Sequence, residues 1–299
     1  MSDSNWLSEF PEMDASDLRA IRKTLDGAYR DFSREYGELI ESLFDPLLAF
    51  LVWFEKLLIS TPWFIILGVC TTLVYAASRS WKLAAACFGS LILIGYFGMW
   101  EDTMRTLSII TVCTMLAIAI GIPIGIAMAR SNRIQSVVTP LLDVMQTMPA
   151  FVYLIPVVML LGIGKIPGLI AVVIYAIPPV IRLTNLGIRL VDKEVLEAAT
   201  AFGASTRQQL FGVQLPLAMP TIMAGINQTI MMALSMVVIA SMIGVKGLGQ
   251  PVLKSITNQY FTLGLLNGLA IVALAILFDR ASQAYAKRTQ THLGDSKHD

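Results

Sequence analysis

The feature that most constrains this sequence is a series of long apolar segments. A helix that crosses a lipid bilayer needs about 20 consecutive, mostly apolar residues, and several segments approach that length. Charged residues make up 14% of the 299-residue chain, whereas soluble domains carry about 25%. We therefore predict an all-α, polytopic helical membrane protein with about seven transmembrane helices. Their approximate ranges are 62–78, 82–100, 104–129, 141–162, 167–188, 220–243 and 262–279.

Positively charged side chains cluster in alternate linkers of this seven-span arrangement. Cytoplasmic loops of membrane proteins carry an excess of Lys and Arg, so these linkers are predicted to be cytoplasmic. The acidic N-terminus of this multi-pass membrane protein is then outside and its C-terminus in the cytoplasm. The clusters are Arg79 with Lys82, Arg130 with Arg133, Arg182 with Arg189, Lys193 and Arg207, and Arg280 with Lys287 and Arg288.

Residues 1–61 form a lead before the first span, and its first part, to about residue 45, is polar and acidic. Apolar residues recur at three- and four-residue steps from Leu18 to Phe32, which predicts an amphipathic helix. Residues 46–60 predict a second helix that lies in the membrane interface, with Trp53 and Phe54 as anchors. The acidic N-terminus is unlike a cleavable signal peptide, so we expect the first span to act as an uncleaved targeting signal.

A polar stretch, EAATAFGASTRQQLFGVQLP, occupies residues 197–216 between two apolar segments. Helix-forming residues precede Gly203, and a second helix can start after it. Two short helices that meet at a glycine form a projecting knob, which can fill a groove on a cytoplasmic partner. The alternative is a solvated connecting loop.

The order of residues in this stretch resembles the EAA signature of ABC-importer permeases. The family pattern is EAA-x3-G-x9-I-x-LP, and this chain departs from it with Val213 in the isoleucine position. In that family the loop forms the coupling helix that docks on the ATP-binding subunit. The resemblance therefore implies an ATPase-coupling loop at residues 190–216. The matching positions are Glu197, Ala198, Ala199, Gly203, Leu215 and Pro216.

Residues 140–168 and 214–250 look like the permease subunit of glycine betaine/proline betaine importers. By this resemblance, which covers roughly residues 100–280, the chain is identified as a member of the binding-protein-dependent transport system inner membrane component family. The fold it implies is the type I ABC-importer transmembrane domain. The expected divisions are the lead at 1–61, two peripheral transmembrane helices at 62–100, a permease core at 101–280 and a cytoplasmic polar tail at 281–299.

The resemblance implies a permease that carries a compatible solute, such as a betaine or a related quaternary amine, across the inner membrane. Its implied partners are two copies of an ATP-binding subunit, an external substrate-binding protein, a second copy of this chain and membrane lipid, with no nucleic acid. ATP and Mg would be held by the partner ATPase. Alternatives are an ABC permease for an amino acid such as histidine or proline, an ATP-independent secondary carrier, and a membrane enzyme.

The sequence offers no catalytic or metal-binding signature of its own. A P-loop is absent, because the tempting GIGK at 162–165 has Met159 in the first glycine position and Ile166 in the place of Ser or Thr. His292 and His298 both lie in the polar tail, so no histidine site is expected within the membrane. We therefore predict that this chain is not an enzyme and holds no cofactor or metal.

Polar residues inside the predicted spans are candidates for the translocation pathway, because they usually face protein or a water-filled cavity. Asp143 and the residues that follow it begin the span at 141–162, and the prolines at 123, 149, 156, 178 and 179 interrupt the middle spans. The alternatives are hydrogen bonds between helices, ordinary packing and bent helices in a bundle. The candidates are Gln146, Thr147, Met148, Phe151, Tyr153, Asn227 and Gln228.

Overall fold

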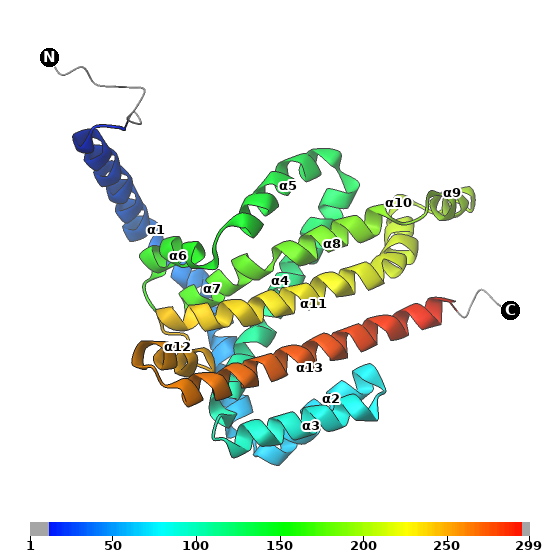
Figure 1. The fold of residues 1–299 in the computed structure, drawn as a ribbon. Helices are drawn as coiled ribbons and strands as arrows, with labels where there is room; N and C mark the ends of the chain where they lie inside the picture. The colour runs from blue at the N-terminus through cyan, green and yellow to red at the C-terminus, as the bar shows by residue number, and fades with distance from the viewer. Residues whose placement is uncertain (1–11, 295–299) are drawn as a thin grey trace.

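Apolar, helix-favouring sequence makes the regular elements of this chain helical (Figure 1). A computed structural model describes the backbone of residues 12–294 and the burial of side chains up to residue 285. No strand occurs in residues 12–294. The elements are α1 (Ala15–Ser60), α2 (Trp63–Ser78), α3 (Trp81–Tyr96), α4 (Trp100–Arg130), α5 (Asn132–Thr147), η1 (Ala150–Tyr153), α6 (Leu154–Leu161), α7 (Lys165–Ala176), α8 (Pro178–Arg189), α9 (Lys193–Ala201), α10 (Thr206–Gln209), the π-helical turn η2 (Leu210–Gln214), α11 (Leu215–Ala240), η3 (Ser241–Ile243), α12 (Gly249–Asn258) and α13 (Phe261–Gly294).

The all-helical membrane fold is confirmed, and the structure refines the number of spans. By length and composition, 4 helices of the described part can cross a membrane, or up to 6 if each of two bent pairs forms one span. The predicted span at 82–100 is α3, an apolar helix of 16 residues, which is shorter than those counted. The 4 long helices are Trp100–Arg130, Lys165–Arg189, Thr206–Ile243 and Phe261–Tyr285.

The predicted span at 141–162 is not one straight helix. α5 ends at Thr147, and the chain resumes as η1 and α6 after a bend of 102°. Met148 has extended backbone (ψ 133°), because the ring of Pro149 disfavours the helical conformation of the residue before it. Two other proline sites in the middle spans do not have this effect: Pro123 lies inside α4, and the pair at 178–179 opens α8 within a single span. For this segment, the broken-helix interpretation of the proline pattern therefore holds.

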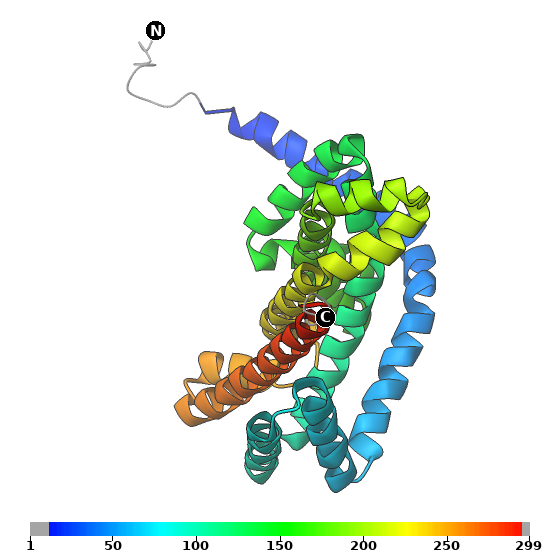
Figure 2. The same ribbon diagram turned by 90° about the vertical axis from the view of Figure 1, so that its right-hand side faces the viewer.

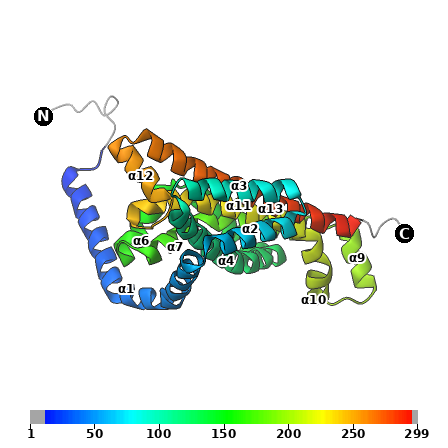
Figure 3. The same cartoon turned by 90° about the horizontal axis from the view of Figure 1, so that it is seen from below.

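The N-terminal lead differs from its prediction, since it forms one helix rather than two. α1 runs for 46 residues with Pro46 inside it, and Asp14 caps its start by accepting the Ser16 N–H at 2.9 Å. The helix follows one edge of the bundle and then turns through 109° into α2 (Figure 3). Ser33 donates its hydroxyl to the Leu160 carbonyl at 3.1 Å, so the first half of α1 is held against α6. Residues 1–11 lie outside the described part of the chain.

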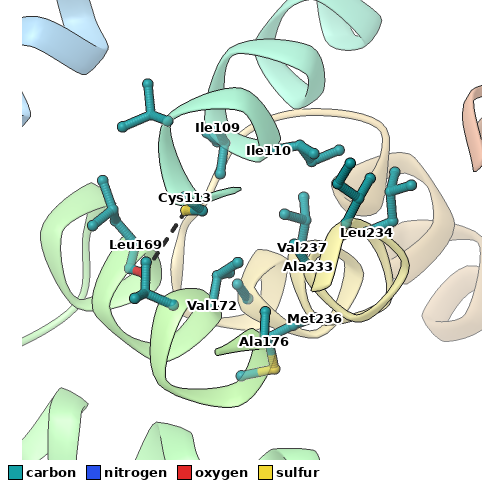
Figure 4. Close-up of a cluster of buried hydrophobic side chains, with 14 of the residues drawn as sticks. Ile109, Ile110, Cys113, Leu169, Val172, Ala176, Ala233, Leu234, Met236 and Val237 are labelled. Atoms are coloured by element: carbon teal, nitrogen blue, oxygen red, sulfur yellow. Dashed lines mark hydrogen bonds between the residues drawn. The ribbon is translucent and has the colours of Figure 1, made fainter. Parts of the chain in front are cut away.

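The core lies where α4, α7 and α11 meet (Figure 4). It is built from branched and small side chains that are almost completely buried. Cys113 of α4 is one of them, and its thiol donates to the Leu169 carbonyl of α7 at 3.8 Å. The residues labelled in Figure 4 are Ile109, Ile110, Cys113, Leu169, Val172, Ala176, Ala233, Leu234, Met236 and Val237.

Glycines allow α8 to lie very close to α4 and α11. A Cβ added at Gly125 of α4 would be 2.8 Å from the Ile181 carbonyl oxygen of α8, and one at Gly121 would be 2.4 Å from an α8 side-chain carbon. On α11, a Cβ at Gly225 would be 3.2 Å from the Pro179 carbonyl oxygen. Membrane helices pack by such close approach of small residues. α8 is thus fixed between two long spans, and it leads directly into the polar stretch.

The helix ends separate into two groups at opposite ends of the bundle. The α2–α3 turn, the α4–α5 turn, α9 with α10, and the C-terminal end of α13 lie at one end, on the right of Figure 1. Figure 2 looks onto this end. The α3–α4 turn, the α6–α7 turn and α12 lie at the other end. Arg79 caps α2 and Arg130 ends α4, so the turns predicted to be positively charged lie together at the end that carries α9.

Candidate functional site

The knob, residues 190–216, projects from one end of the bundle. α9 starts at Lys193, where the Asp192 carboxylate accepts the Glu194 N–H at 3.0 Å. None of the residues of α9 is buried, Glu197 included. Figures 1 and 3 show α9 and α10 standing away from the long helices. This helix therefore presents its side chains outward and does not pack into the core.

Gly203 forms the turn between the two arms of the knob, as predicted. Its φ of +78° lies in the left-handed region, where glycine carries no steric penalty. The Gly203 N–H donates to the Thr200 carbonyl at 2.9 Å, and the Ala204 N–H donates to the Ala199 carbonyl at 3.0 Å. These two bonds form a Schellman motif that ends α9. A Cβ at Gly203 would meet nothing within 4 Å, so the position requires glycine for its backbone conformation and not for space.

The polar side chains of the knob mainly hold its two arms together. Ser205 and Gln208 form a capping box at the start of α10, with the Ser205 N–H 2.8 Å from the Gln208 side-chain oxygen. Gln209 donates to the Thr200 hydroxyl at 2.9 Å and to the Ala204 carbonyl at 3.1 Å. The polar composition that marks this stretch in the sequence therefore stabilises a defined shape, which is more than a solvated linker requires.

The outer surface of the knob carries exposed apolar side chains. Phe202 is 93% exposed and Phe211 is 58% exposed, and the Arg207 guanidinium carbon lies 6.0 Å from the centre of the Phe211 ring. An apolar ring on a polar projection is typical of a contact that inserts into a groove on another protein. Our sequence analysis did not single out either phenylalanine, because both occupy variable positions of the EAA pattern.

The two halves of the EAA pattern lie in different environments. Glu197 and Ala198 are exposed on α9, and Ala199 is half-buried. Leu215 and Pro216 are half-buried at the start of α11, immediately after the π-helical turn. The pattern thus joins an exposed surface to the first turn of a long span.

Arg189 connects the base of the knob to a neighbouring corner of the bundle. It is the last residue of α8, and its Nη2 donates to the Met128 carbonyl at 2.8 Å and to the Asn132 side chain at 2.9 Å. Its Nε donates to Asn185 at 3.0 Å. A cation is favourable beside the unpaired carbonyls at the end of α4. Arg189 therefore ties the last turn of α8 to the corner where α4 ends and α5 begins.

Two predicted pathway residues form hydrogen bonds with other segments of the chain. Tyr153 is buried and donates its hydroxyl to the Met145 carbonyl, and its ring centre is 5.7 Å from that of Tyr175. Asn227 donates to the Asp279 carboxylate of α13 at 2.7 Å. For these two residues, hydrogen bonding between segments accounts for the polar groups.

The other candidates lie mainly on exposed faces. Gln146 and Thr147 are exposed at the end of α5, Phe151 is exposed in η1 and Gln228 is exposed on α11. Met148 is half-buried and packs against the core. The structure therefore does not gather the predicted pathway residues into one enclosed cavity.

An ion pair joins α5 to α8 beside these residues. Arg182 Nη2 donates to Asp143 Oδ1, and the two side chains are 35% and 57% exposed, respectively. In the sequence, Arg182 indicates only orientation, and Asp143 is only a polar residue at the start of a predicted span. The pairing links residues 39 positions apart, so the separate sequence signals could not reveal it.

Comparison with known proteins finds a matching family and relatives that cover most of this chain. Residues 121–291 match the family described as binding-protein-dependent transport system inner membrane component. The glycine betaine/proline betaine transport system permease protein ProW of Escherichia coli (strain K12) is 49% identical over 80% of this chain and 67% of its own length. ProW of Salmonella typhimurium is 50% identical over 73% of this chain and 63% of its length. The glycine betaine/carnitine transport permease protein GbuB of Listeria monocytogenes is 49% identical over 77% of this chain and 82% of its length.

The fold also has a solved counterpart. A chain of the MetNI methionine ABC transporter in an inward-facing conformation aligns with a TM-score of 0.57 at 19% identity, covering 64% of this chain and 95% of that chain. At this identity the likeness concerns the fold alone. It agrees with the predicted ABC-importer transmembrane architecture.

Proposed function

We propose that the solute of this chain is glycine betaine or a related quaternary amine. The premise is that the chain belongs to the binding-protein-dependent transport system inner membrane component family. Family membership makes the chain a multi-pass permease subunit of an inner-membrane ABC importer, with ATP handled by a separate ATPase and solute delivered by a binding protein. The observation that carries the choice of solute is the 49% identity over 80% of the chain to a glycine betaine/proline betaine permease.

The knob is our proposed contact with the ATPase. The exposed face of α9, the exposed ring of Phe202 and the internally braced shape support this role. Glu197, Ala198, Ala199 and Gly203 would form the docking part. Leu215 and Pro216 would connect it to α11. Burial of a single exposed aromatic ring can supply a large share of such a contact.

A homodimer on two ATPase subunits is the proposed assembly. One chain carries one EAA loop, whereas a dimer of ATPase subunits offers two grooves. The exposed polar side chains on α5 and α11 support a second copy or a water-filled space on that side, because polar groups facing lipid are costly. We assign the core to residues 101–280, with α2 and α3 as the peripheral pair at 62–100. Residues 1–61 are then the lead and 281–299 the tail.

The proposed orientation places the knob in the cytoplasm. Positive charges of the α2–α3 turn, the α4–α5 turn and α10 lie at the same end as the knob, which agrees with the preference of Lys and Arg for cytoplasmic loops. The acidic lead is then outside. In this orientation, closure of the ATPase dimer would pull on the knob, and α8 and α11 would transmit the movement during alternating access.

The test of the proposed function is uptake of labelled glycine betaine. Cells that lack other osmolyte carriers would express this chain with its binding protein and ATPase, and unlabelled choline, proline betaine, proline and histidine would compete. We expect uptake that the betaines block and that disappears when the P-loop lysine of the ATPase is replaced. Uptake of histidine or proline instead would change the solute, and uptake that survives the ATPase change would contradict an ATP-driven importer.

A further inference from the structure

The Asp143–Arg182 ion pair lies inside the membrane-spanning part of the bundle. Arg182 belongs to the span Lys165–Arg189 and precedes its end by seven residues, which is about 10 Å along a helix. Asp143 lies in α5, the first half of the broken span. The pair therefore sits about two helical turns inside the end of the bundle that carries the knob.

The exposure of this pair indicates what its face contacts. The two side chains are 35% and 57% exposed, and Gln146 and Thr147 continue the exposed polar surface one turn further along α5. Charged groups inside a membrane avoid lipid and face protein or a water-filled cavity. The α5–α8 face, meaning Asp143, Gln146, Thr147 and Arg182, is thus unsuited to contact with acyl chains.

The pair keeps spare hydrogen-bonding capacity. Arg182 uses one Nη for Asp143, and its buried Nε has no hydrogen-bond partner. Arg189, two turns further along the same helix, instead makes three hydrogen bonds with both Nε and Nη2. A guanidinium can hold a carboxylate through two parallel N–H donors. Arg182 therefore keeps one unsatisfied donor, which a carboxylate can reach only after the pair opens, whereas the described hydrogen bonds of Arg189 hold helices together.

α5 is also weakly anchored, so the pair can open without disrupting the core. Leu142 is the buried residue of this helix, and the remaining side chains are exposed or half-buried. The helix ends at the break beside Pro149. Separation of Asp143 from Arg182 thus requires the movement of a helix that buries little apolar surface.

We propose that Asp143 and Arg182 form a transient binding site for a zwitterionic solute within the translocation pathway. The solute carboxylate takes the place of Asp143 on the Arg182 guanidinium, and the solute ammonium pairs with Asp143. A zwitterion leaves no charge unpaired, whereas a cation without a carboxylate leaves Arg182 without a partner. This inference rests on the proposed function, because glycine betaine carries a carboxylate and a quaternary ammonium in one small molecule.

Protection of an introduced cysteine by solute tests the site directly. Gln146→Cys places a thiol one turn from Asp143, and Ser136→Cys places one two turns away on the same helix as the control. The buried native Cys87 and Cys113 should contribute little background, and the half-buried Cys70 would be replaced by alanine in every variant. The purified permease–ATPase complex without binding protein would be treated with a charged, membrane-impermeant methanethiosulfonate reagent. Glycine betaine or choline would be present at millimolar concentrations.

We expect Gln146→Cys to react and glycine betaine to slow its reaction, with choline far less effective and Ser136→Cys unprotected. Adding Arg182→Gln or Asp143→Asn should weaken the protection about tenfold or more, since each removes a charge-assisted contact. The matched change Asp102→Asn, which alters the 2.9 Å ion pair with Arg105 outside this face, should leave protection unchanged. Assembly with the ATPase would be checked for every variant.

Three results would overturn the site. Absence of reaction at Gln146→Cys would show that the face is not open to water. Equal protection by choline, or protection that survives Arg182→Gln, would remove the carboxylate contact. Uptake by the unmodified transporter is measured in parallel and separates the two proposals. Betaine uptake without protection of the cysteine refutes this site alone. Uptake of histidine or proline in place of betaine refutes both the proposed solute and the ligand named here.

Discussion

Replacement of Gly203 tests whether the shape of the knob controls coupling. The residue has a φ of +78°, and no atom lies within 4 Å of an added Cβ. The cost of a side chain is therefore conformational and not steric, about 1–2 kcal/mol for a residue forced into the left-handed region. That cost shifts the balance between the formed and the opened turn by a factor of about 5 to 30. Gly203→Val should show a larger effect than Gly203→Ala, because a β-branched side chain tolerates this region least.

The assay compares transport with ATP hydrolysis in the reconstituted transporter. We expect Gly203→Val to reduce the solute carried per ATP hydrolysed, or to weaken binding of the ATPase. Gly203→Asn is the matched control, because asparagine enters the left-handed region more readily than other residues with a side chain. Wild-type coupling in Gly203→Val, or equal losses in the valine and asparagine variants, would refute the argument that the backbone of this turn matters.

Three further changes test packing, docking and the corner of the bundle. Gly125→Leu should prevent stable folding, because even a Cβ at this position would lie 2.8 Å from an α8 carbonyl oxygen. In the control Gly68→Ala, the added Cβ has no atom within 4 Å, so the midpoint of thermal unfolding should stay unchanged in a thermal-shift assay. Phe202→Ala should weaken binding of the ATPase about tenfold or more, as loss of an interface anchor does, and Phe261→Ala, which removes a 78% exposed ring, should leave that affinity unchanged. Arg189→Gln should lower the midpoint of thermal unfolding by several degrees, since it removes charged hydrogen bonds to the α4–α5 corner; an unchanged midpoint would contradict that role.

Local signals in the sequence predicted the elements that depend on nearby residues. The break at Gly203 followed from one glycine between two helix-forming runs, and the long apolar segments at 104–129 and 262–279 became α4 and α13. The prolines predicted interruptions in the middle spans but did not show which of them would break its helix, because Pro149 looks in the sequence much like Pro123, which stays inside a helix. The difference depends on which neighbours replace the lost backbone hydrogen bond, and those neighbours are distant in the chain.

The same limit applies to the functional residues. Asn227 is a predicted pathway residue, and nothing in the sequence indicates that it would bond to Asp279, 52 positions away. Arg182 looked like a topological signal until it was paired with Asp143. Residue type alone does not distinguish Arg182 from Arg189. Only the packing of the helices shows that Arg189 makes three hydrogen bonds whereas Arg182 has an unsatisfied donor.

The contrast between the two arginines of α8 suggests how movement of the knob would reach the pathway. Arg189 has three acceptors and fixes the end of α8 to the α4–α5 corner, so we expect a pull on the knob to carry that corner with it. α8 itself cannot slide freely, because Gly125 and Gly225 hold it against two long spans. The weakly anchored α5 is the element that can follow the corner, and its nearest charged contact with α8 is Asp143–Arg182. A change at the coupling surface would then first alter the distance between the two charges that we assign to the solute.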